Sequence, residues 1–162
     1  MLLAPASARA QMEQEVKAAY LFKFLSYVEW PAAAFGGPHA PFVIGVLESE
    51  EVRGALADIV RGREVQGRPV EVRRLRDGET TEGAHVLFVG RDATASLPQL
   101  LGRPGLLIVG EEEALDRGAM INLLRIENRI RFEVAPQAAE RSGLHISSRL
   151  LALAYAVRAA AP

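Results

Sequence analysis

The chain has 162 residues, 49% of them hydrophobic and 24% charged, a composition that fits one globular domain with a sizeable core. Its formal net charge of -1, without any run of Lys or Arg, argues against nucleic acid and anionic membrane surfaces as partners. The sequence contains no cysteine, which excludes disulfides, thiolate chemistry and Cys-ligated metal sites.

The opening residues MLLAPASARAQ are typical of the end of an export signal. Ala8-Arg9-Ala10 fits the small-residue pattern that precedes a cleavage site, and Leu2–Ala6 fits the end of an apolar region. A disordered, alanine-rich tail is the alternative, because no basic region precedes the apolar one. We predict a residual signal peptide or disordered leader over residues 1–11 and a single domain over residues 12–162.

The first predicted helix runs from Glu13 to Trp30, with apolar residues at helical spacing and Pro31 as its stop. Its apolar arc is wide, and a helix buries only part of its circumference against one sheet. We therefore predict that some of its rings form an interaction surface, in a homodimer or with another protein. A helix that is simply packed on the sheet remains the alternative. The candidate rings are Tyr20, Phe22, Tyr27 and Trp30.

Strands and helices alternate through the middle of the chain, which predicts a mostly parallel sheet covered on both faces. The expected strands are Phe42–Leu47, Val70–Leu75, His85–Gly90 and Leu106–Gly110. The expected helical segments are Val52–Arg61, Ala93–Leu101 and a short turn at Ala114–Arg117.

Two apolar runs near the C-terminus, Met120–Ile126 and Ile130–Val134, flank a turn-prone segment and predict a β-hairpin. A two-residue turn at Glu127-Asn128 would pair Ile126 with Arg129. Continued along the strands, this register pairs Leu123 with Phe132 and Asn122 with Glu133.

Beyond the hairpin we expect a short helix after Pro136, an extended piece at Leu144–Ile146, and a last helix that Ser147 caps and that reaches Val157. The predicted fold class is therefore α/β. It is a single-domain, mixed, mostly parallel sheet with helices on both faces and a C-terminal β-hairpin plus helix.

Three segments, VKAAYLFKFLSYVEWP, GAMINLL with RIRFEV, and AAERSGLHISSRLLALA, resemble the YfiR-like family of small bacterial periplasmic proteins. The resemblance covers Val16 to Val157. It implies a periplasmic regulator that binds the periplasmic portion of a membrane-bound diguanylate cyclase and represses it, which lowers cyclic di-GMP and biofilm formation. A further expected partner is an outer-membrane lipoprotein that sequesters the regulator, and the wide apolar arc of the first helix leads us to expect a homodimer. Some members carry cysteine pairs, so redox sensing through such pairs is excluded here.

Acidic residues follow three predicted strands, at Glu48–Glu51, Gly90–Asp92 and Gly110–Glu113, where ligands often bind in open α/β sheets. A phosphoacceptor receiver domain would need a lysine after a late strand, and no lysine follows Lys23. No glycine-rich phosphate loop is present, and the three histidines share no metal-ligand spacing. We expect no catalytic residue, metal or cofactor.

The polar face of the predicted hairpin is the candidate site for a ligand or partner, because Arg131 offers a planar donor fork to a carboxylate. An internal contact that stabilises the sheet is the alternative. Two functions remain open: the non-catalytic cyclase-binding regulator that the resemblance implies, and a periplasmic small-molecule-binding sensor whose ligand binds at the carboxyl edge of the sheet or on the hairpin face. The candidate residues are Asn122, Arg131, Glu133, Ser148 and Arg149.

Overall fold

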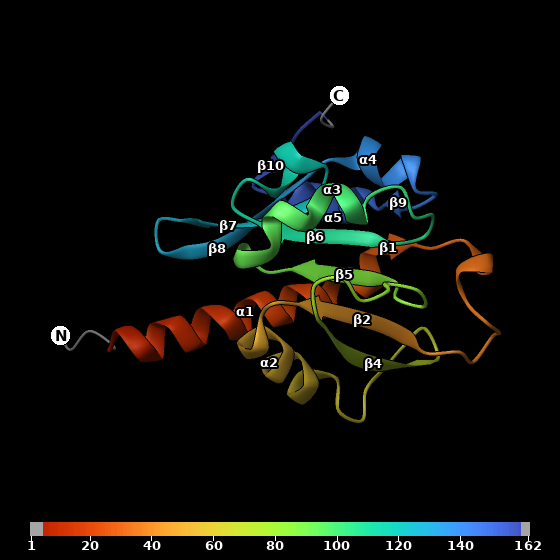
Figure 1. Cartoon of the computed structure of the whole chain (residues 1–162), viewed down its shortest axis with the longest axis horizontal. Helices are drawn as coiled ribbons and strands as arrows, with labels where there is room; N and C mark the ends of the chain where they lie inside the picture. Colours follow the sequence, from red (N-terminus) through yellow and green to blue (C-terminus); the bar gives the residue numbers. More distant parts are fainter. Residues whose placement is uncertain (1–4, 160–162) are drawn as a thin grey trace.

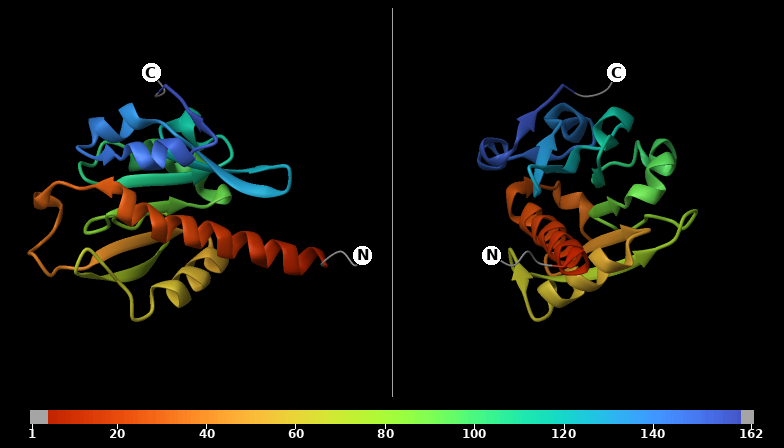
Figure 2. Two further views of the ribbon diagram at one scale, coloured as in Figure 1. Left: turned by 180° about the vertical axis from the view of Figure 1, so that it is seen from behind. Right: turned by 90° about the vertical axis from the view of Figure 1, so that its left-hand side faces the viewer.

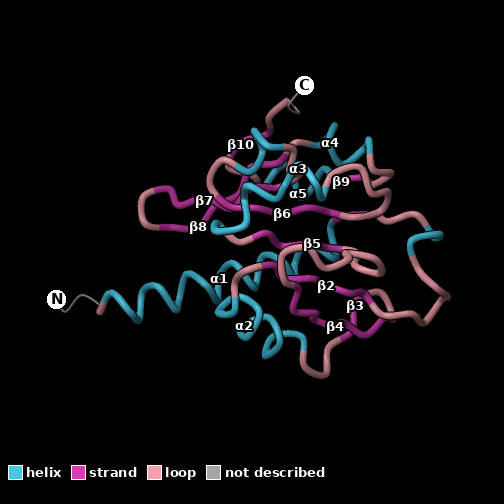
Figure 3. Tube along the Cα trace, viewed as in Figure 1, coloured by secondary structure: helices cyan, strands magenta, loops and turns pink. Residues whose placement is uncertain are grey.

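An eight-stranded sheet with helices on both faces forms the centre of the computed structural model, which describes residues 5–159 (Figures 1 and 3). The sheet has the order β10-β8-β7-β6-β5-β2-β4-β3, and β1 pairs with β9 beside it. The strands are β1 (Val28–Glu29), β2 (Phe42–Leu47), β3 (Glu64–Val65), β4 (Arg68–Leu75), β5 (Val86–Val89), β6 (Leu107–Glu111), β7 (Ile121–Ile126), β8 (Arg129–Val134), β9 (His145–Ile146) and β10 (Ala156–Val157).

The helices are α1 (Ala6–Tyr27), α2 (Glu50–Val60), α3 (Leu97–Leu100), α4 (Pro136–Arg141) and α5 (Ser148–Leu153), with 3-10 turns η1 (Ala32–Ala34), η2 (Arg91–Ser96) and η3 (Ala114–Arg117). Strands β4, β2, β5, β6 and β7 are parallel, whereas β8 is antiparallel to β7 and β3 to β4. The predicted mixed, mostly parallel sheet in one α/β domain is confirmed.

The sheet separates two apolar clusters, one on each face. The larger cluster contains residues of α1, α2, α4 and α5, including Phe24, Leu56, Ala139 and Leu150. The smaller one is covered by η2, α3 and η3. Seen from behind, α1 and α5 lie in front of the sheet, whereas α3 lies in front in the opposite view (Figures 1 and 2). Helices therefore cover both faces, as alternating strands and helices require.

Helix α1 differs from its predicted range at both ends. It starts at Ala6, so helical backbone runs through part of the segment that was assigned to a leader or disordered tail. It ends at Tyr27 because Val28 pairs with Ile146, which turns the chain into β1 before Pro31. The leader over residues 1–11, its export and its cleavage stay predictions, and residues 1–4 of this leader lie outside the described residues. The N-terminal half of α1 extends beyond the sheet on the side where the β7–β8 hairpin also projects (Figure 1).

The β7–β8 hairpin has the predicted register, with Ile126 opposite Arg129 and Asn122 opposite Glu133. Its turn residues Glu127 and Asn128 both have positive φ, of 50° and 65°, as a two-residue turn that matches the strand twist demands. The side chains on one face of the hairpin pack in the larger cluster: Ile121, Leu123, Ile130, Phe132 and Val134.

Two predicted helices are shorter than expected. Ala93–Leu101 is divided between η2 and α3, with Pro98 in the first turn of α3. Ser147 does cap the last helix, since its Oγ accepts the Leu150 N–H at 3.2 Å. That helix does not reach Val157, however, because residues 156–157 form β10 on the outer edge of β8. There the Tyr155 N–H bonds to the Phe132 carbonyl at 2.8 Å.

His85 anchors the long loop that joins β1 to β2. Its Nδ1 accepts the Val43 N–H at 3.0 Å, and its Nε2 lies 2.9 Å from the Ala34 carbonyl, to which it donates. The ring also stacks on Phe35, at 4.4 Å between centroids. Only the neutral imidazole can accept at one nitrogen and donate at the other. Burial accordingly lowers the pKa of His85 from its ordinary value of 6.5.

We expect the free energy of unfolding to decrease as the pH falls below about 6.5, because the unfolded chain then binds a proton that the folded His85 resists. The loss continues until the pH passes the lowered pKa of the folded state. Urea titrations between pH 7.5 and 5.5 measure it, with His85→Gln as the matched variant. If the variant loses as much stability as the wild type over this range, His85 is not the group responsible.

Candidate functional site

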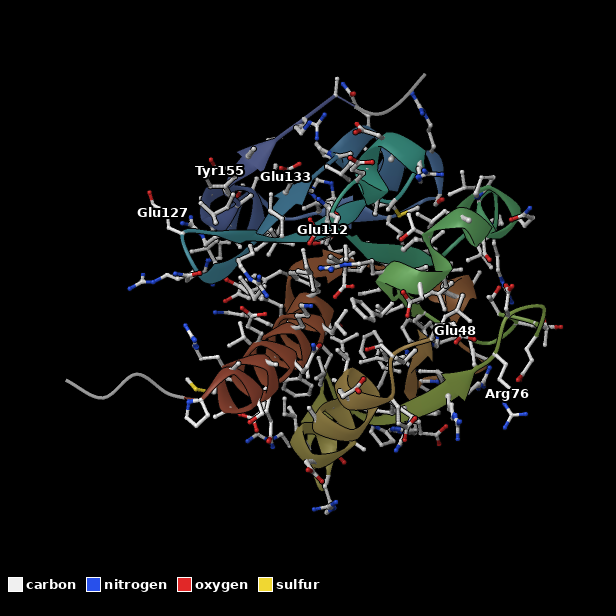
Figure 4. All side chains as sticks on the ribbon, turned by 60° about the vertical axis from the view of Figure 1, so that its left-hand side comes forward. Glu48, Arg76, Glu112, Glu127, Glu133 and Tyr155 are labelled. Carbon is white, nitrogen blue, oxygen red and sulfur yellow. The ribbon has the colours of Figure 1, made fainter. Side chains whose placement is uncertain are left out.

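The polar side chains of the hairpin are held by contacts within the chain. Asn122 is 2% exposed and its amide donates to the Glu112 carbonyl. Glu133 is 8% exposed and accepts a hydrogen bond from Arg158 at 3.0 Å. The Arg131 guanidinium lies 5.6 Å from the centre of the Tyr155 ring. Figure 4 shows Glu133 close to Tyr155 at the edge of the sheet. The C-terminal segment therefore contacts the predicted outward face at Arg131 and Glu133, whereas Asn122 bonds to the loop after β6.

Ser148 and Arg149 lie on the other side of the sheet. They begin α5, whose Leu150 belongs to the same apolar cluster as α1. Asn122, with its neighbours on the hairpin's polar face, points away from that cluster because the alternate residue Leu123 points into it. The five residues predicted to form one binding face are therefore not brought together. Asn122, Arg131 and Glu133 lie on one face of the sheet, and α5, which begins with Ser148 and Arg149, packs on the other.

The four predicted interaction rings are half buried, and none belongs to the strongly exposed large apolar side chains. Tyr20, Phe22 and Tyr27 lie in α1, whereas Trp30 follows β1. The Tyr20 hydroxyl donates to the Ile130 carbonyl at 3.1 Å, and the Trp30 indole donates to the His85 carbonyl at 3.2 Å. The Arg63 guanidinium lies 5.7 Å from the Phe22 ring, and Tyr27 packs against the larger cluster. Contacts within the chain therefore cover part of each ring, and an interaction surface formed by these rings stays a prediction.

A groove of about 620 Å³ separates the N-terminal half of α1 from the tip of the β7–β8 hairpin. We call it the helix–hairpin groove. In Figure 4 the hairpin tip, marked by Glu127, lies across from the N-terminal part of α1. Two of the strongly exposed apolar side chains, Met12 at 59% and Val16 at 41%, belong to this groove. Its lining residues are Ala6, Arg9, Ala10, Met12, Glu13, Val16, Arg125, Asn128, Arg129 and Ile130.

The charged residues of the helix–hairpin groove are three arginines and one glutamate. Arg125 and Glu13 form an ion pair at 2.5 Å that joins the hairpin to the helix and raises the pKa of Arg125. Arg9 and Arg129 take part in no ion pair among residues 5–159. The groove therefore combines apolar surface with uncompensated positive charge at its borders.

Below the groove, a buried ion pair fixes α1 to the sheet. Lys17 Nζ lies 2.5 Å from Glu111 Oε1, and both side chains are 9% exposed. The second carboxylate oxygen of Glu111 accepts the Arg91 N–H at 3.0 Å. Glu111 ends β6 and Arg91 follows β5, so the Lys17 ammonium lies at the carboxyl ends of these two strands. Ligands often bind at this position in open α/β sheets.

The acidic residues after β2 lie at the surface. Glu50 pairs with Arg53 at 2.6 Å, and the hydrogen bond from Arg53 lowers the pKa of Glu50. Within residues 5–159 no group of three or more His, Cys, Asp or Glu side chains is arranged to hold a metal ion. Nor does any helix in this range have the length and apolar character needed to cross a bilayer.

Residues 14–155 match a protein-family model described as YfiR/HmsC-like. The chain belongs to the YfiR/HmsC-like family. The resemblance expected from its N- and C-terminal segments is confirmed. No curated protein sequence matches the chain significantly.

The YfiR/HmsC-like match includes the buried Lys17–Glu111 pair and the whole hairpin. It starts after Glu13, so the outer part of the α1 border, with Arg9 and Met12, lies before the matched span. Sequence analysis missed both the ion pair and the groove. A lysine inside an apolar helix was a usable signal, because such a residue needs a buried partner. The partner itself is 94 positions away and was not predictable.

Proposed function

We propose that this YfiR/HmsC-like chain is a non-catalytic periplasmic regulator that binds a membrane-bound diguanylate cyclase and represses it. The observation that carries the proposal is the family match over residues 14–155. Repression of this kind lowers cyclic di-GMP inside the cell and with it biofilm formation. A regulator that binds one conformation of the cyclase more tightly than another shifts the cyclase toward that conformation, which requires no chemistry by the regulator itself.

The arrangement of ionisable groups supports a binding role rather than catalysis. Lys17 and Glu111 neutralise each other below the surface, and both ring nitrogens of His85 are occupied by backbone groups. The small-molecule sensor considered from the sequence is not proposed, because the residues expected to bind its ligand lie on opposite faces of the sheet.

The proposal is tested by mixing the purified chain with the purified periplasmic portion of a membrane-bound diguanylate cyclase from the same organism. We expect a complex that is stable enough to sediment as one species and to give a titration by calorimetry. An unrelated periplasmic domain of similar size is the negative control. If no such cyclase portion binds the folded chain above the level of this control, repression by direct binding is wrong.

A further inference from the structure

We infer that His85 is a pH-sensitive latch for part of the loop that joins β1 to β2. Figure 1 shows this loop in orange, at the end of the sheet away from the N-terminus of α1. The uncharged ring holds residues 31–36, which we call the latched segment, against the sheet. Protonation of the ring releases this segment while the sheet stays folded. The inference goes beyond the proposed function, because it holds whichever protein the chain binds.

The His85 ring replaces a missing backbone partner at the start of β2. The Val43 carbonyl accepts the His85 N–H at 2.8 Å, so both backbone groups of Val43 face the β5 side of the strand. Strand β5 begins only at Val86, and the Val43 N–H donates to the His85 ring instead, at 3.0 Å to Nδ1. A buried N–H needs an acceptor, so the start of β2 depends on this ring nitrogen.

Backbone partners fix which ring nitrogen of His85 carries the proton. An amide N–H only donates, so Nδ1, which faces Val43, is unprotonated. A carbonyl only accepts, so Nε2, which lies 2.9 Å from the Ala34 oxygen, carries the hydrogen. A second proton would turn Nδ1 into a donor that faces another donor. The charged ring therefore cannot keep both contacts.

The surroundings of the ring disfavour a positive charge. His85 is 5% exposed, and its aromatic neighbours on the loop and on β2, Phe35 and Phe42, are uncharged. The charged groups that act on the ring are the guanidinium groups of Arg68 and Arg73 on β4, and both are cations. Both arginines therefore favour the neutral ring.

The titratable side chains of the neighbouring loops do not offset these two arginines. Glu82, before β5, is exposed, and so is His39 in the loop between β1 and β2. Arg103, before β6, donates to the Thr81 hydroxyl at 2.9 Å. Burial lowers the pKa of His85 and outweighs the hydrogen bond to the Ala34 carbonyl, which raises it.

A charged ring reaches water only if the latched segment moves. Phe35 stacks on the His85 ring with 4.4 Å between centroids, and the Ala34 carbonyl lies at Nε2. Residues 31–36 contain no buried residue, so little apolar burial holds the latched segment in place. Segments of this kind open locally at a smaller free-energy cost than the whole fold.

A second anchor limits how far the opening spreads. Arg68 donates to the carbonyls of Gly37 and Ala40, at 2.8 and 2.7 Å. Because arginine stays charged at every relevant pH, these contacts persist in acid and the opening ends at residue 36. The departure of Phe35 uncovers the ring of Phe42, which lies 5.1 Å away and is 1% exposed. Acid thus exposes an apolar surface that is covered at neutral pH.

The size of the response follows from proton linkage. Once the latched segment is open, the pKa of His85 returns to its ordinary value of 6.5, whereas burial lowers it in the closed form. The open form therefore binds more protons, and its population rises as the pH falls below 6.5 until the lowered pKa is passed. Between pH 7.5 and 5.5 the ratio of open to closed molecules is expected to rise by about tenfold.

Native-state hydrogen exchange of the full chain, followed by NMR, tests the latch. The probes are the Phe35 and Val43 amides, and the reference is the Gly90 amide, which bonds to the Leu47 carbonyl. We expect the protection factors of both probes to fall by about tenfold from pH 7.5 to pH 5.5. At pH 5.5 low urea should accelerate exchange of Gly90 but not of the probes, because a local opening exposes little surface. If all three amides respond equally to urea, acid acts through global unfolding and the inference is wrong.

Variants of two histidines identify the titrating group. His85→Gln should reduce the change in Val43 protection over this pH range to less than about twofold, and the matched control His39→Gln should keep the tenfold change. A tenfold change in His85→Gln, or its loss in His39→Gln, would overturn the inference. If His85→Gln does not fold, the ring nitrogen shifts of the wild type decide. They should place the proton on Nε2 at pH 7.5, and a proton on Nδ1 or a ring that titrates at or above pH 6.5 would contradict the latch.

Discussion

Replacing Lys17 with methionine is expected to lower the free energy of unfolding by about 3–5 kcal/mol. The replacement leaves the Glu111 carboxylate, 9% exposed, without its counterion and with only the Arg91 N–H as a hydrogen-bond donor among the described residues. An uncompensated charge in such a site costs far more than the loss of a surface ion pair. Urea unfolding at neutral pH measures the change.

Two further variants isolate the cause. Lys17→Met combined with Glu111→Leu removes both charges, so most of the lost stability should return. Arg125→Met breaks the Glu13–Arg125 pair, in which the arginine is 55% exposed, and should cost at most about 1 kcal/mol. If Lys17→Met costs no more than Arg125→Met, the Lys17–Glu111 pair does not hold α1 in place.

Truncating Phe24 to alanine is expected to cost about 3–5 kcal/mol, because its ring is fully buried between α1 and the hairpin. The ring contacts Phe132 edge-on at 5.4 Å and stacks near Tyr20 at 6.0 Å. Phe22→Ala should cost clearly less, since Phe22 is half buried and its cation–π contact with Arg63 is worth about 1 kcal/mol.

Thermal unfolding of the two alanine variants decides between a core helix and an interaction helix. Similar stabilities for Phe24→Ala and Phe22→Ala would contradict the assignment of Phe24 to the core and of Phe22 to the half-buried surface of α1. If Phe22→Ala loses partner binding while its stability is unchanged, the aromatic rings of α1 form part of the partner interface.

Local patterns predicted the parts of the fold that depend on neighbouring residues. The hairpin register follows from alternating apolar residues and from a turn that tolerates positive φ at Glu127 and Asn128. The cap at Ser147 follows from its hydroxyl before an apolar helical run. In both cases the interacting groups lie close together along the chain, so the sequence contains the necessary signal.

Contacts between distant segments explain the errors. Residues 154–157 continue the apolar pattern of the last helix, but residues 156–157 pair with the outer edge of β8 as β10. The unpaired backbone groups of that edge strand need hydrogen-bond partners, which this segment supplies. The alternation along β8 predicts that the Glu133 side chain points away from the core and is free to bind a partner. Instead, Arg158 of the C-terminal segment donates a hydrogen bond to it. At the N-terminus, alanine-rich residues suit both a signal sequence and a helix, and composition alone does not separate the two.

Cellular cyclic di-GMP is the most direct measure of the proposed regulation. We predict that deleting the gene raises cyclic di-GMP, that restoring the wild-type chain lowers it, and that the rise disappears when the partner cyclase is deleted as well. A deletion that leaves cyclic di-GMP unchanged while the cyclase is present and active would contradict direct repression. A rise that persists without any membrane-bound diguanylate cyclase would contradict it equally.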